Sequence, residues 1–183
     1  MFISPKVAIE EGWITHPNCS TYQDWEDNNF VSPNAIDFPL NRLFSINQSN
    51  TFLVSENRKL LRGGEEILPT TKCEDGSPYL FWKLNPNTVY DGVSDMYVNI
   101  PSGIAAQIII RSTFSRNGLF ITSGLWDSGF KGSIGMAIHN RSGEAFIAPG
   151  TRIGQIIFIE SQNALMYAGG WNHEKGTHWS EKQ

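Results

Sequence analysis

Short stretches rich in β-branched and aromatic residues, each ending at a cluster of Gly, Pro or Asn, most constrain the fold of this chain. Turn sequences such as NPNT, NRSGE and APGT separate them. Many short strands joined by turns are typical of an all-β protein, a sandwich or a barrel-like fold. Nine strands are predicted: Leu43–Ile46, Thr51–Val54, Pro78–Leu84, Met96–Ile100, Ala105–Arg111, Leu119–Thr122, Ser133–His139, Glu144–Ala148 and Arg152–Glu160.

Helical periodicity is nearly absent. A Ser/Thr cap followed by acids predicts a helix near Ser20–Asn28, and a single turn is expected at Ser112–Asn117. The tail from Gly169 onward has no apolar period but combines glycines with two tryptophans, which suits a lid that closes over a ligand. We therefore expect one β domain over residues 1–166 and a C-terminal lid over residues 167–183.

Charge is scarce and unevenly distributed. Charged residues make up 17% of the 183-residue chain, against about 25% in typical globular proteins, which suggests surface hidden in subunit interfaces. The net charge of −4 argues against binding a nucleic-acid polymer, which needs a basic footprint. Residues 1–110 hold seven bases and thirteen acids, whereas residues 111–183 hold seven bases and five acids. An anionic ligand is thus expected in the second half.

Nothing in the sequence points to export or to a membrane. Cys19 and Cys73 are too few for a disulfide framework and lack metal-site spacing. The start MFISPKVAIEEGW lacks a basic region followed by an apolar stretch, and no apolar run approaches about 18 residues. We expect a soluble protein in the cytoplasm, or in the host cytoplasm if the chain is virus-encoded, with no membrane partner.

The segment RSTFSRNG directly follows the apolar strand AAQIII. A strand that runs into a hydroxyl-rich turn, a helix N-terminus and two arginines suits phosphate, because free N–H groups and fixed cations converge there. The candidate residues are Arg111, Ser112, Thr113 and Arg116. The alternative is an ordinary capped helix with two solvated arginines.

Two further segments offer polar groups in unusual surroundings. In GLWDSGFKG, Asp127 lies between aromatic residues and glycines such as Gly124, where it could orient a water as a general base. The alternative is a turn residue without a chemical role. In PGTRIGQ, Gln155 would lie among apolar neighbours with a donor and an acceptor, or would simply be a strand residue.

Familiar catalytic signatures are missing from the sequence. His173, Glu174 and His178 match no established metal spacing. There is no GxxxxGK[ST], GxSxG, HExxH or zinc-deaminase HxE…PCxxC pattern. We therefore expect neither a metal held by protein ligands alone nor a serine or cysteine nucleophile.

In this order, the segments resemble the superfamily of trimeric dUTP diphosphatases (dUTPases) and dCTP deaminases. SPNAIDF is similar to the family's QPASLDL, RSTFSRNG to RSSLARxG, GLWDSGFKG to GxIDxGFKG, and GTRIGQIIF to GxRIGQLxF. YAGGWNHEKGT resembles the deaminase tail YxGKYQxQKGPT. The likeness covers roughly residues 31–177, and the first thirty residues are only weakly comparable.

The resemblance implies a distorted β-barrel or jelly-roll subunit in a homotrimer, with active sites at subunit interfaces. The partner would be a pyrimidine deoxynucleoside triphosphate, and the cofactor Mg²⁺, held through the substrate phosphates. Carried over by motif, Arg111, Ser112 and Arg116 would bind phosphates, and Asp127 would contact the deoxyribose and orient the water. Phe130 would pack on the sugar and Gln155 would line the nucleotide site.

One position separates the two chemistries of the superfamily. Deaminases carry a glutamate in the strand after the hairpin, which shuttles protons to cytosine C4, and this chain has Ala137 there. Alanine cannot transfer a proton, whereas a diphosphatase needs only a positioned water and neutralised phosphates. Ala137 therefore favours a dUTP diphosphatase.

The tail departs from both branches. The family's phosphate-binding lysine is replaced by Gly170 and its glutamine by Glu174, so Lys175 and Trp171, with Tyr167, are the candidates for phosphate contact and a stacking lid. Base selectivity therefore stays open. The alternatives are a dCTP deaminase, alone or coupled to triphosphate hydrolysis, a catalytically silent nucleotide-sensing regulator, and a structural β-sandwich protein.

Overall fold

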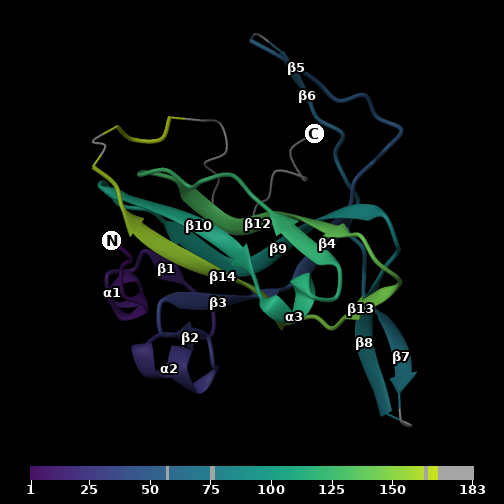
Figure 1. Ribbon diagram of the computed structural model, residues 1–183, viewed down its shortest axis with the longest axis horizontal. Coiled ribbons are helices and arrows are strands. Elements are labelled where there is room, and N and C mark those ends of the chain that lie inside the picture. Colours follow the sequence, from purple (N-terminus) through teal and green to yellow (C-terminus); the bar gives the residue numbers. More distant parts are fainter. Residues whose placement is uncertain (57, 75–76, 163–164, 169–183) are drawn as a thin grey trace.

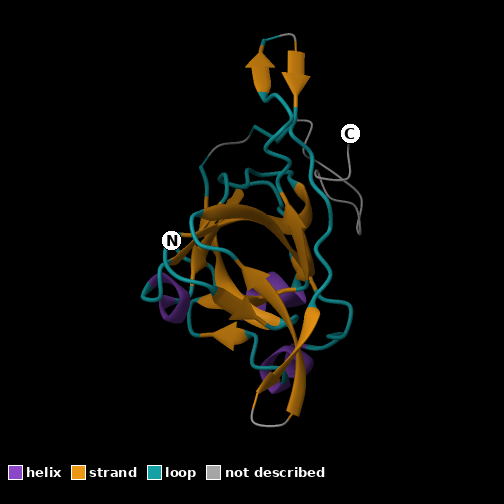
Figure 2. Cartoon of the chain, turned by 90° about the vertical axis from the view of Figure 1, so that its right-hand side faces the viewer, coloured by secondary structure: helices purple, strands orange, loops and turns teal. Residues whose placement is uncertain are grey.

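The computed structural model describes residues 1–56, 58–74, 77–162 and 165–168. Figure 1 shows two packed β-sheets as the body, with two hairpins that extend away from it in opposite directions. Seen after a quarter turn, the strands curve around a common interior (Figure 2). The prediction of an all-β, jelly-roll-like fold is confirmed.

The first sheet is built around the long strand β9 (Thr88–Asn99). This strand pairs with β1 (Ile14–Thr15), β4 (Arg42–Ser45) and β12 (Lys131–Asn140), and β12 also pairs with β11 (Leu119–Thr122). All of these pairs are antiparallel. The strand β9 is therefore a hub that brings residues from three other parts of the chain side by side.

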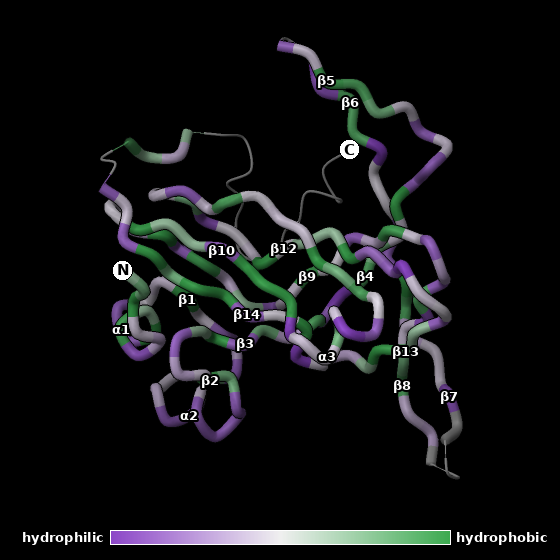
Figure 3. The backbone as a smooth tube through the Cα atoms, viewed as in Figure 1, coloured by the Kyte–Doolittle hydropathy of each residue, from purple (hydrophilic) through white to green (hydrophobic). Residues whose placement is uncertain are grey.

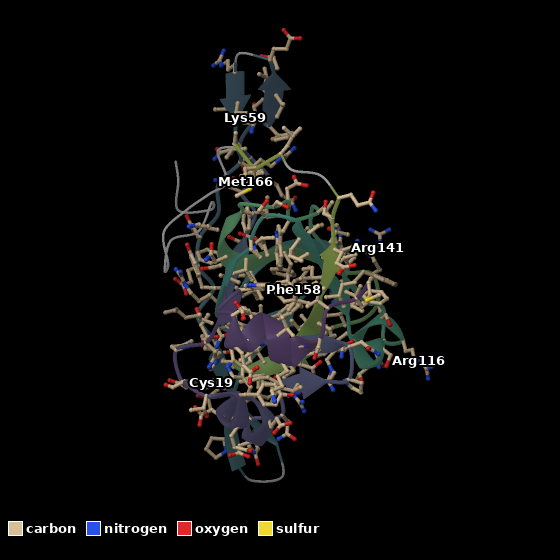
Figure 4. The ribbon with its side chains drawn as sticks, turned by 90° about the vertical axis from the view of Figure 1, so that its left-hand side faces the viewer. Cys19, Lys59, Arg116, Arg141, Phe158 and Met166 are labelled. Carbon is tan, nitrogen blue, oxygen red and sulfur yellow. The ribbon has the colours of Figure 1, made fainter. Side chains whose placement is uncertain are left out.

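The second sheet has the order β10 (Ile104–Ile110), β14 (Thr151–Glu160), β3 (Ala35–Leu40) and β2 (Val31–Ser32), again antiparallel. Alternate side chains of β10 and β14 point inward, as expected for a sheet with one buried face. Figure 4 shows Phe158 directed into the interior of the molecule and Arg116 directed outward. Ile134, Ile138 and Ile156 are fully buried in the shared core.

Two hairpins extend beyond the core. One consists of β7 (Thr70–Glu74) and β8 (Ser77–Leu84), to which β13 (Ala145–Ile147) adds a third strand. The other consists of β5 (Leu53–Ser55) and β6 (Arg58–Leu60), and its described residues are exposed on both strands. In Figure 3 the second hairpin mixes hydrophobic and hydrophilic residues along its length, whereas the central strands are mainly hydrophobic.

All nine predicted strands overlap observed ones, although Met96–Ile100 covers only the last four residues of β9 and Thr51–Val54 shares only Leu53 and Val54 with β5. The unpredicted strands are β1, β2, β3, β6 and β7. The strand β3 lacks an alternating pattern because all six of its residues are buried. Its Pro39 is accommodated at a register irregularity opposite Arg152.

The helices are short. The predicted ones are present as α2 (Tyr22–Asp27) and α3 (Ser112–Ser115), and α1 (Pro5–Glu10) is additional. The Thr21 side chain and the Asp24 side chain form a capping box at the start of α2. Among the described residues, no helix is long and apolar enough to cross a membrane. The proposed boundary of the lid at residue 167 stays a prediction, since residues 169–183 lie outside the described part of the chain.

Candidate active site

The end of β10 carries the predicted phosphate segment. Arg111 is the N-cap residue of α3, and no side chain caps this helix. Ser112 and Thr113 are exposed in the first turn, and Arg116 is exposed at its end. Two hydroxyl groups and Arg111 therefore lie at an uncapped helix start, with Arg116 at the other end of this single turn, an arrangement suited to oxyanions.

A buried carboxylate organises the arginines beside this segment. Asp37, on β3, is 3% exposed. Its Oδ2 lies 3.3 Å from Nη1 of Arg152 and 3.7 Å from Nε of Arg111. Arg111 also donates to the Arg152 carbonyl oxygen at 3.3 Å. With two guanidinium groups and one carboxylate, the group carries a net positive charge, and both guanidinium groups remain about a third exposed to a ligand.

Gln155 belongs to the same group. On β14 it lies opposite Asp37 on one side and Ile109 on the other. Its Nε2 donates to Asp37 Oδ1 at 2.7 Å and to the Ser32 hydroxyl at 3.2 Å. The Gln155 side chain is therefore held by protein partners. In a nucleotide site it would position Asp37 as well as contact the ligand.

Asp37 and Ser32 were not among the predicted site residues. The sequence carries a signal for Asp37, because an acid inside the apolar run AIDFPL must be either exposed or paired. Only the pairing of β3 with β14 identifies its partners.

The predicted hairpin lies elsewhere on the subunit. The backbones of Trp126 and Ala106 exchange two hydrogen bonds of 2.9 Å, which fixes the hairpin against the middle of β10. The rings of Trp126 and Phe130 stack at 5.9 Å with an interplanar angle of 5°. Asp127, between them in sequence, is exposed. The arrangement presents a solvated carboxylate next to two buried aromatic rings.

Tyr167 reaches this hairpin from the C-terminal end of the described chain. Its N–H donates to the Ser128 carbonyl at 2.6 Å, and its ring lies 5.6 Å from that of Phe130 at 75°. Figure 4 places Met166 at the same end of the molecule as Lys59 of the β5–β6 hairpin. The predicted contact residues Trp171 and Lys175 lie outside the described residues.

A cavity of about 830 Å³ opens beside the hairpin. Its volume lies within the range typical of small-molecule sites. The predicted residues Gly124, Phe130 and Tyr167 line it, and so does Ala137. The sequence did not predict the contributions of the segment around β5 and β6 or of β9. These residues are Ile46, Gln48, Phe52, Leu61, Arg62, Val89 and Asp91.

The predicted residues therefore fall into two groups on one chain. Trp126 is fixed beside Ala106, and Arg111 follows Ala106 by five residues along an extended strand. At about 3.3 Å per residue this separates the two backbone positions by about 17 Å. The structure brings Arg111 and Gln155 together through Asp37, but it does not bring them to Asp127.

Cys19, by contrast, is not a candidate site residue. It is buried and forms no disulfide. Burial, reinforced by Asp24 and Asp95, raises the pKa of its thiol above the ordinary value. A protonated thiol is a weak nucleophile. The structure therefore gives no reason to add this cysteine to the site.

Comparison of the sequence with known proteins supports the same family. A family model described as dCTP deaminase-like matches residues 20–161. A probable deoxyuridine 5'-triphosphate nucleotidohydrolase of Methanopyrus kandleri is 28% identical over 146 residues, covering 79% of this chain and 89% of the relative. A dCTP deaminase of Acidianus ambivalens is 29% identical over 138 residues, covering 67% of this chain and 80% of the relative.

A similar fold is found in the crystal structure of 2'-deoxycytidine 5'-triphosphate deaminase from Agrobacterium tumefaciens. The TM-score is 0.60 at 14% sequence identity, with 86% of this chain covered. The chain spans 47% of the length of that protein. At this identity the likeness concerns the fold alone.

Proposed function

Because this chain belongs to the dCTP deaminase-like family of nucleotide enzymes, we propose that it hydrolyses a pyrimidine deoxynucleoside triphosphate between the α- and β-phosphates. With dUTP the products are dUMP and pyrophosphate, the reaction of a dUTP diphosphatase. The observation that carries the proposal is the cavity itself. Its lining includes the stacked rings of Trp126 and Phe130 and the methyl group of Ala137, which suit a base, and Asp127, the residue after Trp126, is exposed.

The chemistry assigns one role to each group. Asp127 accepts a proton from a water molecule, whose oxygen attacks the α-phosphorus as the bond to the β-phosphate breaks and pyrophosphate leaves. Trp126 and Phe130 hold the base and sugar and exclude water. Arg111 and Arg116, with the first-turn groups of Ser112 and Thr113, bind the triphosphate.

Mg²⁺ is expected to arrive with the substrate. This ion usually keeps several waters and is held by one or two carboxylates together with substrate phosphates. The family resemblance implies that the triphosphate oxygens hold the ion. When bound, Mg²⁺ neutralises phosphate charge.

A second copy of the chain completes the site in this proposal. The Asp127 hairpin and the arginine group lie about 17 Å apart along β10, and Arg111 is turned toward Asp37 on the second sheet. A homotrimer, the assembly implied by the family resemblance, would bring the hairpin of one subunit to the arginines of another. The scarcity of charged residues is in keeping with extensive subunit interfaces.

A second candidate function is dCTP deamination, alone or followed by triphosphate hydrolysis. The observation that favours it is Asp91, a carboxyl group lining the cavity on the strand next to Ala137. Such a group could accept and return the proton that alanine cannot transfer.

The experiment that separates these functions is a product analysis. The purified chain is incubated with dUTP, dCTP and dTTP, with and without Mg²⁺, and pyrophosphate, ammonia and nucleoside monophosphates are measured. Pyrophosphate without ammonia supports the proposed hydrolysis, and ammonia from dCTP supports the second candidate. Absence of every product, with nucleotide binding shown by calorimetry, would contradict both and favour a nucleotide-sensing regulator.

A further inference from the structure

One basic side chain lines the cavity to which the proposed function assigns the nucleotide. Among the described residues of the cavity lining, Arg62 is the only basic one. It lies two residues after the end of β6 and is half-buried. A guanidinium group keeps its proton in proteins. Arg62 therefore brings a fixed positive charge to a lining that also contains apolar residues such as Ile46, Phe52 and Leu61.

The backbone that carries Arg62 is tied to the body of the molecule. The side-chain amide of Asn50 donates to the carbonyl oxygen of Arg62 at 2.7 Å. The N–H of Asn47 donates to the carbonyl oxygen of Gly63, the next residue, at 3.1 Å. Asn47 follows β4, which pairs with β9 in the first sheet. The position of Arg62 is thus set by the sheet rather than by the exposed strands β5 and β6.

The guanidinium group of Arg62 is held only weakly by the protein. Its Nη1 donates to the carbonyl oxygen of Gln48 at 3.4 Å, which is longer than the usual range of about 2.7–3.2 Å for such a bond. A guanidinium group has five N–H donors in a planar fork that matches two oxygens of a phosphate group. An oxyanion in the cavity could therefore engage these donors without breaking a strong hydrogen bond.

The charge of the surrounding segment also favours an anion. Residues 46–64 contain three bases, Arg58, Lys59 and Arg62, and one acid, Glu56, so the segment is positive within an acidic half of the chain. Figure 4 shows Lys59 at the same end of the molecule as Met166, and the residue after Met166 lines the cavity. A positive potential at this end attracts the anionic part of a ligand.

We propose that Arg62 binds the phosphate chain of the nucleotide in the cavity, an inference that rests on the proposed function. The base and the sugar of the substrate are uncharged, whereas its phosphate oxygens carry the negative charge that a guanidinium group matches. The chain that encloses the base then also contacts the phosphates. Arg111, which the proposed function supplies from another copy of the chain, would bind them from the other side.

The test compares a ligand that has phosphates with one that has none. The whole protein with Mg²⁺ is titrated calorimetrically with the α,β-imido analogue of dUTP, and the affinity for deoxyuridine is measured by its competition with this analogue. In Arg62→Ala the affinity for the analogue should fall about ten-fold or more, because charge-assisted hydrogen bonds are lost. The affinity for deoxyuridine should change little.

A matched control separates a direct contact from a general effect of charge. Arg58 is exposed on β6 of the same hairpin and is not part of the cavity lining. Arg58→Ala and Arg62→Ala change the net charge equally, but Arg58→Ala should leave both affinities unchanged. Arg62→Gln keeps a polar side chain without the charge, so it should lose affinity for the analogue as Arg62→Ala does.

Each outcome bears on the inference. Unchanged affinity of Arg62→Ala for the analogue overturns it, and so does an equal loss for deoxyuridine, which would indicate a role at the base or in the cavity wall. An equal effect of Arg58→Ala also overturns it. If Arg62→Ala does not fold, Arg62→Gln decides by the same comparison.

Failure of this inference can be distinguished from failure of the proposed function. If the unmodified protein releases pyrophosphate from dUTP and the Arg62 variants bind the analogue normally, only this inference fails. If the unmodified protein neither binds the analogue nor releases pyrophosphate, the proposed function fails as well.

Discussion

The side-chain amide of Gln155 donates a 2.7 Å hydrogen bond to the carboxylate of Asp37, directly across the β14–β3 pair. The other carboxylate oxygen faces the guanidinium groups of Arg111 and Arg152. One buried acid thus links three strands and fixes a cation at the start of α3. Arg111, in the predicted phosphate segment, is therefore paired with an acid more than seventy residues earlier in the chain.

Asp37→Asn tests this arrangement. The amide keeps the shape of the side chain but loses the charge that holds both arginines, so we expect unfolding to become easier by about 1–3 kcal/mol. This is less than for a fully buried pair, because the guanidinium groups are about a third exposed. Urea denaturation measures stability, and nucleotide titration should show weaker binding. Asp27→Asn, at an exposed helix end, is the control, and equal effects would contradict the role of Asp37.

Asp127→Asn tests the general base. The amide cannot accept the proton of the attacking water, so kcat should fall by about 10²–10⁴-fold while affinity for the α,β-imido analogue changes little. Steady-state pyrophosphate release and calorimetry provide the two readings. Retention of kcat would exclude Asp127 as the base.

Mixed oligomers test whether two chains build one site. Asp127→Asn and Arg111→Ala should each be nearly inactive alone. When the two variants are unfolded together and refolded as a mixture, some interfaces combine the intact hairpin of one chain with the intact arginine of another, and activity should return. No recovery in mixtures shown to contain both chains would mean that the two groups act within a single chain.

Gly129→Ala tests the backbone of the hairpin. Gly129 has φ of +87°, and an added Cβ would lie 2.9 Å from Cε of Met166. We expect a loss of about 1–2 kcal/mol and displacement of Tyr167, whose N–H bonds the adjacent Ser128. Thermal denaturation and tyrosine fluorescence measure the two effects. Gly143→Ala, where nothing lies within 4 Å of the added atom, should change little, and a similar loss there would contradict the explanation.

Because of the capping box at the start of α2, we expect the stability of the folded protein to depend on pH. Hydrogen bonds from the backbone N–H groups of Thr21 and Ser20, and from the Thr21 side chain, lower the pKa of Asp24 below its ordinary 3.8. A lowered pKa in the folded state means that the stabilisation is present above the ordinary value and is lost as pH falls through the folded value. Denaturation of the unmodified protein and of Asp24→Asn should therefore differ at neutral pH and converge in acid. A constant difference would contradict this account.

Much of the secondary structure could be predicted, because the residues of each segment and its flanking turns specify it without reference to distant partners. Short runs rich in β-branched and aromatic residues between turn clusters predicted β10, β12 and β14, and a Ser/Thr cap followed by acids predicted α2. The strand β3 was not predicted, because a strand that is buried on both faces lacks the alternation of apolar and polar residues. The strand β9 was found only in part, because its first half contains Asp91 and Gly92, which disfavour strands when judged without their partners.

The sequence by itself determined the all-β class and pointed to the segments whose polar groups are candidates for binding a nucleotide, because turn residues, strand composition and motif spacing are local properties. The tertiary structure decided which of these groups meet. It joined Arg111 to Gln155 through Asp37, separated them from Asp127 along β10, and placed Asp91 beside Ala137. The physical reason is strand register: residues become neighbours through hydrogen-bonded pairing of strands that are remote in sequence, and no local pattern specifies that pairing.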